Sequence, residues 1–441
     1  MREMRDSGVP WIGEVPAGWE VRRVKSIATF SRGLDILKTD LVDDEGTACV
    51  SYGEAHGRLK FSFDAENDYI RKAPPQFIEG RERSLVRQGD FIFADTSEDI
   101  EGSGDFTCNF GTEPVYAGYH SHIVRLRDKD AIDYRFLAYE FESQPFRVQI
   151  QQAVSGVKVY TISVKTIGNA EVLLPPLSEQ RRIADWLDER CAAIDAAVEA
   201  ARASIEEYQA YKKSVISHAV TRGLDPDAPL KDTGIRWIGE IPEHWETVPV
   251  KAVTKRRSGH TPDRKIPEYW DGDIVWVSLA DSPYLRKHRY ISESKNHITL
   301  AGIEHSSAEI LPSGCVLLSR DATVGLCAIT KTELAVSQHF MAYECAPAIY
   351  NEYLLDVFYA MNDELIGMSM GSTIPTIGLP LIRKLVTPLP PLPEQHAIAD
   401  YLDSRTSAID AVVAQKRAIV EDLLAYKKSL IYEAVTGKRE V

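Results

Sequence analysis

The chain has 441 residues, 44% of them hydrophobic and 26% charged, a composition typical of a globular protein with two or three domains. No apolar run approaches the ~20 residues that a membrane-spanning helix needs, and the N-terminus lacks the apolar core of a signal peptide, so we expect a cytoplasmic protein. The formal net charge of −14 argues against non-specific nucleic-acid binding, unless basic side chains gather on one face or partners supply positive charge.

A tryptophan motif occurs twice in the chain. Residues 8–20 have the sequence GVPWIGEVPAGWE and residues 234–246 have GIRWIGEIPEHWE, a shift of 226 residues. The simplest interpretation is that each motif packs a connecting segment onto a domain. Direct contact with a ligand is the alternative for the four tryptophans, Trp11, Trp19, Trp237 and Trp245.

A variable block follows each motif. The first block, residues 21–170, contains short alternating runs such as FIFAD and SHIVRLR and a late helical stretch, DYRFLAYEFESQPFRVQIQQ. The second block, residues 248–386, has candidate strands at DIVWVSL, GCVLLSR and GLCAIT and a late helical stretch, YNEYLLDVFYAMNDELI. The two blocks share little obvious sequence, yet each is typical of one α+β domain.

A long helix is predicted after each block. Residues 173–223 and 389–437 are similar, with a shift of 215 from Leu177 to Leu392 and from Lys212 to Lys427. Both carry apolar residues in two rows with sevenfold spacing, the a and d positions of a coiled coil. Proline pairs precede the helices, and Gly223 and Gly437 end them. Such a stripe needs a partner, and the other copy is the obvious one. The predicted interface residues are Leu187, Ile194, Val198, Ile205, Val215, Leu402, Ile409, Val413, Val420, Leu423 and Leu430.

Two lysines interrupt the apolar rows at the same place. Lys212 and Lys427, again 215 residues apart, occupy interior heptad positions. They either extend into solvent along their aliphatic stems or fix the register of the helix pair, and the sequence leaves both interpretations open.

These features divide the chain into five segments and define an α+β fold with a pseudo-twofold internal repeat. The segments are a first α/β domain at 1–172, a long helix at 173–223, a linker with the second WIGE motif at 224–247, a second domain at 248–388 and a second long helix at 389–441.

With this order of motifs, the chain resembles the specificity subunit of type I restriction–modification systems. The resemblance rests on the doubled LPPLxEQ helix, the WIGExPxxW motif and the stretches HTPDRKIPEYWDGDIVWVSLAD, LPSGCVLLSRDATVGLCAI and ELAVSQHF. It implies that each block is a target recognition domain and that the helices form an antiparallel coiled coil between the two domains. It also implies two methyltransferase subunits and restriction/translocase subunits as partners. S-adenosylmethionine, ATP and Mg²⁺ would bind to those partners, with no cofactor in this chain.

The repeat supports double-stranded DNA as a ligand independently of the resemblance. Two copies of one unit match two DNA half-sites, and different blocks imply different half-sites. A rod of ~42 helical residues is about 60 Å long, so we expect a spacer of fixed length, with half-site centres ~34 Å apart. Partner subunits are expected to dock on exposed parts of the helices, around Glu179, Gln180, Glu394 and Gln395.

The resemblance assigns no base-reading residue, so candidates for DNA contact come from polar, glycine-flanked loops that carry basic groups. A solvated loop position is the alternative for each one, but as a group some should contact phosphates and a few should reach base edges. In the second block the candidates are Lys255, Arg256, Arg257, Ser258, His260, Thr261, Arg264, Lys265, Tyr269, Arg320, Thr323 and His339, with Trp270, Gln338 and residues 286–289 nearby. In the first block they are Arg32, Thr96, Ser97, Ser103, His120, His122, Lys158 and Tyr160.

Two other functions remain open from the sequence. Asp263 with Glu293 and Lys295 fits the loose nuclease pattern PD…(D/E)xK, whose carboxylates would hold Mg²⁺, but three common residue types with a free gap often occur by chance. The acidic balance favours, as the second alternative, a coiled-coil scaffold that never meets DNA. The sequence contains no phosphate-binding loop, no methyltransferase motif and no C-x-x-C or H-E-x-x-H spacing, so it predicts neither a catalytic nor a metal site.

Overall fold

The computed structural model describes residues 3–156, 158–370 and 375–441. The chain divides into two compact units, unit 1 with residues 1–201 and 418–441, and unit 2 with residues 202–417. Each unit therefore contains one domain together with part of both long helices, α7 (Leu177–Arg222) and α14 (Leu392–Val435). None of the helices in the described part of the chain combines the length and the apolarity needed to cross a lipid bilayer.

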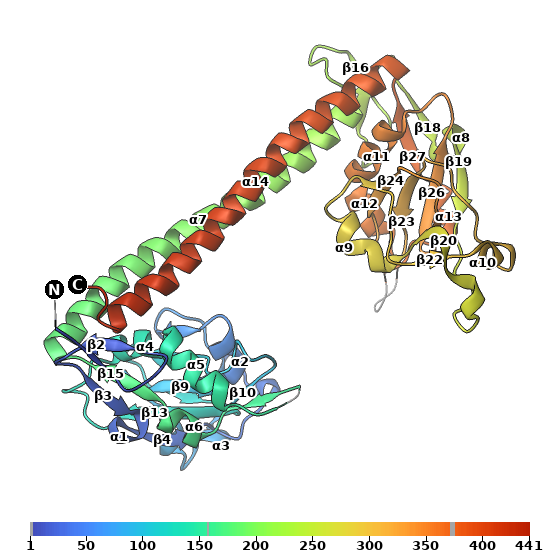
Figure 1. Cartoon of the computed structure of the whole chain (residues 1–441). Helices are drawn as coiled ribbons and strands as arrows, with labels where there is room; N and C mark the ends of the chain where they lie inside the picture. Colours follow the sequence, from blue (N-terminus) through green and yellow to red (C-terminus); the bar gives the residue numbers. More distant parts are fainter. Residues whose placement is uncertain (1–2, 157, 371–374) are drawn as a thin grey trace. The chain divides into compact units, whose positions relative to one another are not determined.

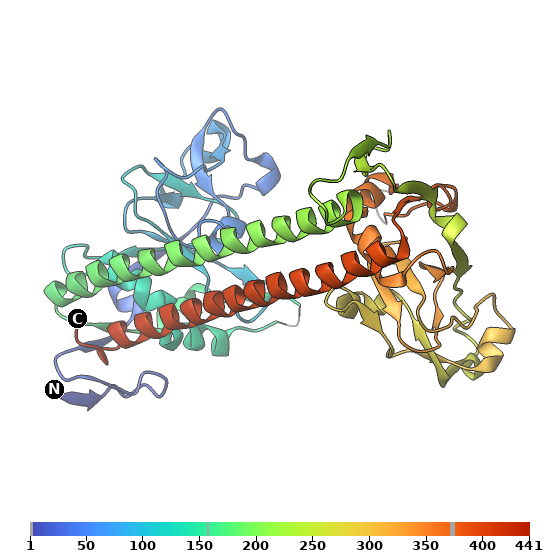
Figure 2. The ribbon, with the colours of Figure 1, turned by 90° about the horizontal axis from the view of Figure 1, so that it is seen from above.

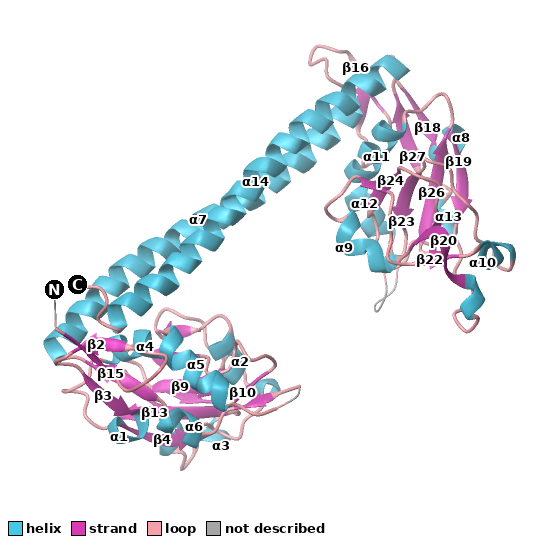
Figure 3. Cartoon of the chain, viewed as in Figure 1, coloured by secondary structure: helices cyan, strands magenta, loops and turns pink. Residues whose placement is uncertain are grey.

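The core of unit 1 is a five-stranded sheet between two layers (Figures 1 and 3). In spatial order its strands are β4 (Ala28–Arg32), β13 (Ser121–Leu126), β9 (Phe91–Ala94), β11 (Phe106–Asn109) and β6 (Phe61–Phe63), antiparallel except for the last pair. Because side chains alternate along a strand, Phe91 and Phe93 lie on one face of the sheet and Ile92 lies on the other.

Helices cover the phenylalanine face of this sheet, and a smaller sheet covers the opposite face. The helices are α4 (Tyr134–Glu142), α5 (Gln144–Ala153) and α6 (Val164–Asn169). The strands of the smaller sheet are β7 (Lys72–Ala73), β5 (Thr47–Val50), β12 (Val115–Ala117) and β8 (Leu85–Val86).

Unit 2 repeats this plan with different residues. Its five strands are, in spatial order, β19 (Thr254–Ser258), β26 (Phe340–Cys345), β23 (Val316–Ser319), β24 (Cys327–Thr330) and β21 (Tyr290–Ile291), and again only the last pair is parallel. The helical layer is α11 (Asn351–Ala360), α12 (Asn362–Met368) and α13 (Leu379–Ile382). The small sheet is β22 (His297–Ile298), β20 (Trp270–Val277) and β25 (Ala335–Val336). Two blocks with little common sequence therefore build one topology.

Each predicted late helical stretch is two helices. In unit 1 the chain turns at Ser143, whose extended backbone ends α4, and Pro145 lies in the first turn of α5. Proline is accepted there because the first amide groups of a helix have no intrahelical partner.

The two tryptophan motifs form short hairpins, β1 (Met4–Asp6) with β2 (Glu14–Pro16) and β16 (Leu230–Asp232) with β17 (Glu240–Pro242). The second tryptophan of each motif is buried, with Trp19 3% and Trp245 0% exposed. Nε1 of Trp19 donates to Oε2 of Glu179 at 3.2 Å, and Nε1 of Trp245 donates to Oε2 of Glu394 at 2.9 Å. These two tryptophans therefore pack the motif onto the start of a long helix.

The glutamines that follow these glutamates are buried as well, Gln180 being 2% and Gln395 0% exposed. Oε1 of Gln180 accepts from the backbone N–H of Asp133 at 2.9 Å, and Oε1 of Gln395 accepts from that of Tyr350 at 2.7 Å. Their Nε2 atoms donate to the carbonyls of the first proline of each pair, both at 2.8 Å. The prediction that these glutamines offer a docking surface is wrong, because they join each long helix to its own domain.

The long helices begin later than the predicted boundaries at 173 and 389. Position 173 lies within β15 (Glu171–Leu174), which pairs with β3 (Glu20–Arg23), and position 389 is the last residue of β27 (Val386–Leu389), which pairs with β18 (Glu246–Pro249). Segment 224–247 is not a free linker throughout, since Ile238, Ile241 and Trp245 belong to the core of unit 2. The predicted stops hold, because Gly223 (φ +73°) and Gly437 (φ +69°) take the left-handed conformation that ends helices.

The two long helices pack against each other in each unit. In unit 1 the end of α14 lies beside the first half of α7, and in unit 2 the last turns of α7 lie beside the start of α14 (Figures 1 and 2). The helices are therefore antiparallel, which confirms the predicted fold class. Of the predicted interface residues, Leu187, Ile194, Val198, Val215, Leu402, Ile409, Val413 and Leu430 are buried, whereas Ile205, Val420 and Leu423 are half-buried.

In each unit an ion pair joins the two long helices. Nζ of Lys212 lies 2.6 Å from Oδ2 of Asp410 in unit 2, and Nζ of Lys427 lies 2.7 Å from Oδ2 of Asp195 in unit 1. The two lysines and the two aspartates are each 215 residues apart, so the pairs are related by the internal repeat. Of the two interpretations of these lysines, the geometry supports the one in which they fix the register.

Reversing one of these ion pairs tests that role. We expect Asp410→Lys to destabilise unit 2 by up to about 1 kcal/mol, because half-exposed ion pairs contribute little and two lysines would then face each other. The swap Lys212→Asp with Asp410→Lys should recover most of the loss in thermal unfolding followed by circular dichroism. Asp403→Lys, at an exposed position of the same helix, is the control. Equal unfolding of the single and swapped variants would contradict a specific pair.

Glu140 gives a pH-dependent prediction. It is fully buried, its Oε1 accepts from the backbone N–H of Leu173 at 2.8 Å, and burial raises the pKa of its carboxyl group from 4.5 to about 8. As the pH rises from 4.5 to 8, the unfolded chain ionises this group while the folded chain keeps it neutral, so unit 1 loses stability. Glu140→Gln keeps the acceptor and should raise stability at pH 8 by up to roughly 4 kcal/mol.

The comparison is thermal unfolding of the Glu140→Gln variant and the natural chain at pH 4.5 and pH 8. The difference between the two proteins should be large at pH 8 and small at pH 4.5. Glu189→Gln, at an exposed position of α7, should give no such change with pH. A difference that is the same at both pH values would show that Glu140 is not neutral in the fold.

Candidate nucleic-acid interface

Three strands of the unit 2 sheet meet at one edge. β19 ends at Ser258 opposite Met341, and β23 ends at Ser319 opposite Phe340, the first residue of β26. The loops that leave these strands carry His260, Thr261, Arg320, Thr323 and His339. The structure thus brings together candidates from three separate stretches of sequence, and we call this set the loop edge of unit 2.

Polar contacts organise this loop edge. Nδ1 of His339 lies 2.9 Å from Oδ2 of Asp321, and the Thr261 hydroxyl donates to Oε1 of Gln338 at 2.5 Å. The Thr323 hydroxyl lies 3.2 Å from those of Ser282 and Ser319. Oδ1 of Asp321 and Oγ of Ser337 are buried without a hydrogen-bond partner within the described residues. Such atoms are uncommon in a finished fold.

Unit 1 has the corresponding loop edge. β4 ends at Arg32 and β9 ends at Ala94, so Asp95 and Thr96 directly follow β9. β13 begins at Ser121, so His120 directly precedes it. These three strands correspond to β19, β23 and β26 of unit 2. Strand β10 (Thr96–Ser97) pairs with β14 (Tyr160–Thr161), which adds Ser97 and Tyr160 to this edge. Lys158 lies just before β14 and is exposed. Nδ1 of His120 lies 2.8 Å from Oδ1 of Asp95.

Main-chain hydrogen bonds show that the two edges are equivalent. The N–H of Asp95 donates to the carbonyl of His120 at 3.0 Å, as the N–H of Arg320 does to His339 at 2.9 Å. The carbonyl of Asp95 accepts from Ile162 at 2.8 Å, as the carbonyl of Arg320 accepts from Ile377 at 2.9 Å. The same backbone frame therefore presents different side chains in the two units.

A glycine is required at the same position of each edge. A Cβ atom on Gly33 would lie 2.0 Å from the carbonyl oxygen of Gly118, and one on Gly259 would lie 1.9 Å from that of Val336. No side chain fits at such a distance, so these glycines let the chain that leaves β4 pass close to the end of β12 and the chain that leaves β19 pass close to β25.

Several predicted contact residues are engaged elsewhere. Arg257 binds Glu344 at 2.8 Å and Glu309 at 2.9 Å, and Arg289 binds Asp356 at 2.8 Å. Burial raises the pKa of Asp356 to about 6, even though Arg289 opposes this shift. Both arginines stabilise the domain of unit 2 and are not free to bind phosphates.

The remaining candidates differ in their accessibility. His122 is buried in unit 1, with Nε2 3.0 Å from the carbonyl of Ile162, and burial lowers the pKa of its imidazole. Ser103 is also buried. The ring of Tyr269 stacks on His305, with a centroid distance of 5.5 Å. The exposed basic candidates of unit 2 are Lys255, Arg264, Lys265, Arg286 and Lys287, with His288 beside them and Arg256 half-buried on β19.

Residues that the sequence analysis missed line a large cleft in unit 1. Its volume is about 1660 Å³. On its wall the buried carboxylate of Asp105 binds Arg147 at 2.6 Å, Lys60 at 2.8 Å and His56 at 3.0 Å. Burial alone would raise the pKa of Asp105, but these three groups lower it to about 2, and the hydrogen bond to Asp105 raises the pKa of His56. No local motif marks these residues, because each lies more than forty residues from Asp105 in the sequence.

The nuclease pattern does not form a site. Oδ1 of Asp263 accepts from the backbone N–H of Lys265 at 2.9 Å within its own turn, and Glu293 and Lys295 are exposed residues after β21. Within the ranges that the structure describes, no three side chains of His, Cys, Asp or Glu are placed to hold a metal ion. Nothing in the fold supports the nuclease alternative.

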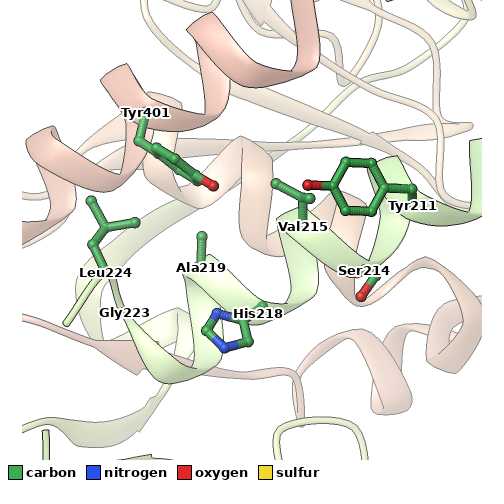
Figure 4. A pocket seen from close by; sticks show the side chains of 8 residues that line it. All are labelled: Tyr211, Ser214, Val215, His218, Ala219, Gly223, Leu224 and Tyr401. Atoms are coloured by element: carbon green, nitrogen blue, oxygen red, sulfur yellow. The ribbon is translucent and has the colours of Figure 1, made fainter. Parts of the chain in front are cut away.

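A smaller hollow in unit 2 belongs to the helices. Its volume is about 430 Å³, and it lies between the last turns of α7 and Tyr401 of α14 (Figure 4). The hydroxyl groups of Tyr211 and Tyr401 point toward each other across it. His218 is the only titratable nitrogen side chain in the lining, so this hollow lacks the cationic groups that a phosphate backbone requires.

The chain belongs to the family of the type I restriction modification DNA specificity domain, whose model matches residues 16–206 and 242–421. The MjaIX specificity subunit of a type I restriction enzyme from Methanocaldococcus jannaschii is 33% identical over 185 residues, 41% of each chain. The MjaVIII specificity subunit from the same organism is 27% identical over 97% of this chain and 94% of its own length.

A solved structure that concerns complex assembly and conformational transition of the type I R-M system has the same fold. It covers 96% of this chain and 99% of its own, with a TM-score of 0.70 and 16% sequence identity. The family resemblance predicted from the motifs is therefore confirmed.

The glycine of the unit 2 loop edge gives a direct test of its construction. We expect Gly259→Ala to destabilise unit 2 by roughly 1–3 kcal/mol, because the added methyl group overlaps the carbonyl of Val336. Gly367→Ala, in α12, meets no atom within 4 Å and should be neutral or stabilising. Denaturant unfolding of both variants measures the difference, and equal stabilities would argue against the close crossing.

Proposed function

We propose that the chain is the DNA-recognition subunit of a type I restriction–modification system. Each unit would recognise one half of an asymmetric, bipartite target in double-stranded DNA. The observation that carries this proposal is the pair of equivalent loop edges, which share a main-chain frame but present different side chains. Two loop edges with the same main-chain frame would dock on DNA in the same manner, and their different side chains would select different bases.

The long helices would set the distance between the half-sites. Both helices are continuous, with 46 and 44 residues, and in each unit they are joined to the domain through a buried glutamine and a tryptophan–glutamate hydrogen bond. The repeat-related ion pairs favour one register of the pair. A fixed register supports a spacer of constant length and unread sequence.

We expect the chain to act without catalysis of its own. Two methyltransferase subunits and restriction/translocase subunits would supply the chemistry, with S-adenosylmethionine, ATP and Mg²⁺ bound to those partners. They would dock on exposed faces of the long helices, and the assembly would work in the cytoplasm, where the DNA is. The net charge of −14 supports a role for partners in binding the phosphate backbone.

Methylation mapping with a block exchange tests this function. Cells expressing the chain with its methyltransferase should methylate one split, asymmetric sequence. Replacing residues 248–388 with the matching block of a relative should change one half of that sequence and keep the other half and the spacer. A matched chimera that exchanges residues 21–170 should change the opposite half. Methylation without sequence preference, or changes in both halves from one exchange, would contradict the proposal.

A further inference from the structure

A histidine held by a carboxylate occurs at the equivalent position of both loop edges. Nδ1 of His120 lies 2.8 Å from Asp95, and Nδ1 of His339 lies 2.9 Å from Asp321. Each histidine directly precedes the first residue of the corresponding strand, β13 or β26. The histidines thus occupy one position in two blocks that otherwise share little sequence.

The two carboxylates come from different places in their loops. Asp95 is the first residue after β9, whereas Arg320 occupies that position after β23 and Asp321 is the next residue. Two different sequences therefore produce one side-chain arrangement. The backbone of His120 is also unusual, since its φ of +56° is in the left-handed region that residues other than glycine seldom adopt. Strain of this kind concentrates at functional positions.

The carboxylate selects one tautomer of each neutral imidazole. A carboxylate only accepts hydrogen bonds, so the facing Nδ1 carries the proton and Nε2 of the neutral ring is an acceptor. The side chains of His120 and His339 are 36% and 34% exposed. The amide nitrogen of Gln338 lies 3.5 Å from Nε2 of His339, a long distance for a hydrogen bond. The group that fits best at Nε2 is a hydrogen-bond donor.

We propose that Nε2 of His120 and Nε2 of His339 each accept a hydrogen bond from the exocyclic amino group of an adenine or cytosine in the major groove, one in each half-site. This inference rests on the proposed function. The major groove presents adenine N6 and cytosine N4 as donors. A phosphate fits worse, because the carboxylate behind each ring repels it. Asp95 and Asp321 are positioning residues that hold the tautomer and the ring plane.

The test is a selection of binding sites from randomised duplex DNA by the full chain with its methyltransferase subunit. His339→Ala should lose the preference for an amino-bearing base at one position of one half-site, by about tenfold, and leave the other half-site unchanged. His120→Ala should do the same in the opposite half-site. Asp321→Ala should weaken the preference at the position that His339→Ala affects. Lys251→Ala, at an exposed position of α8 (Val250–Val253) before the opposite end of β19, is the control and should change no base preference.

Base analogues give a readout that a structural role would not change. Purine in place of the selected adenine, or pyrimidin-2-one in place of cytosine, removes the amino group. With either analogue at the position that His339→Ala affects, binding by the natural chain should weaken about tenfold. Binding by the His339→Ala variant should not change. If a histidine variant fails to fold, the analogues are tested with the natural chain alone. The inference is overturned if binding is insensitive to the analogues at every position of both half-sites.

The other outcomes separate the inference from the function on which it rests. If the natural chain selects a bipartite site and both histidine variants keep every base preference, the inference is wrong and the function stands. A uniform loss of affinity with a smaller salt dependence would identify phosphate contacts and overturn it as well. If the natural chain selects no sequence, the proposed function fails and the inference fails with it.

Discussion

The structure depends on the way in which each long helix is joined to its domain. At both helix starts, a glutamate accepts from the indole of the preceding motif. The next residue, a buried glutamine, accepts from the N-cap residue of a domain helix, α4 in unit 1 and α11 in unit 2. Buried amides are costly unless both ends are bonded, and in Gln180 and Gln395 both ends are. Within each unit this joint gives the sheet, and therefore its loop edge, one fixed orientation relative to the adjoining helix segments.

This joint explains how the two blocks can diverge while the fold stays the same. The sheet is covered on both faces, so its central strands require apolar side chains toward both layers but not particular ones. Phe91 and Phe93 fill the helical face in unit 1, where Val316 and Leu318 fill it in unit 2. The shared requirements are few, namely the glycine that crosses a strand and the main-chain bonds at the loop edge. Side chains at that edge are consequently free to change without loss of the core.

The long helices, their stops and the α+β class followed from the sequence because periodicity and glycine positions are local signals. The buried role of Gln180 and Gln395 did not follow, since a polar residue in a first helical turn has the same pattern whether it faces solvent or a neighbouring helix. The loop edges were only partly predictable. Arg257 and Arg289 have the sequence context of phosphate contacts, but their partners Glu344 and Asp356 lie 87 and 67 residues away. Only the fold shows that these charges are already paired.

The distribution of charge reconciles an acidic chain with DNA recognition. Many of its cations are neutralised internally: Arg257 and Arg289 in the unit 2 domain, Arg147 and Lys60 around Asp105, and Lys212 and Lys427 between the helices. Phosphate binding by these six side chains is limited as a result, because each is already paired with a carboxylate. The loop edges keep polar and imidazole groups beside a few cations, Arg32 and Lys158 in unit 1 and Arg320 in unit 2. Polar groups of this kind discriminate between bases better than they attract the backbone. This composition of the loop edges suits a subunit whose task is to recognise a DNA sequence, because side chains that hydrogen-bond to base edges distinguish one base pair from another.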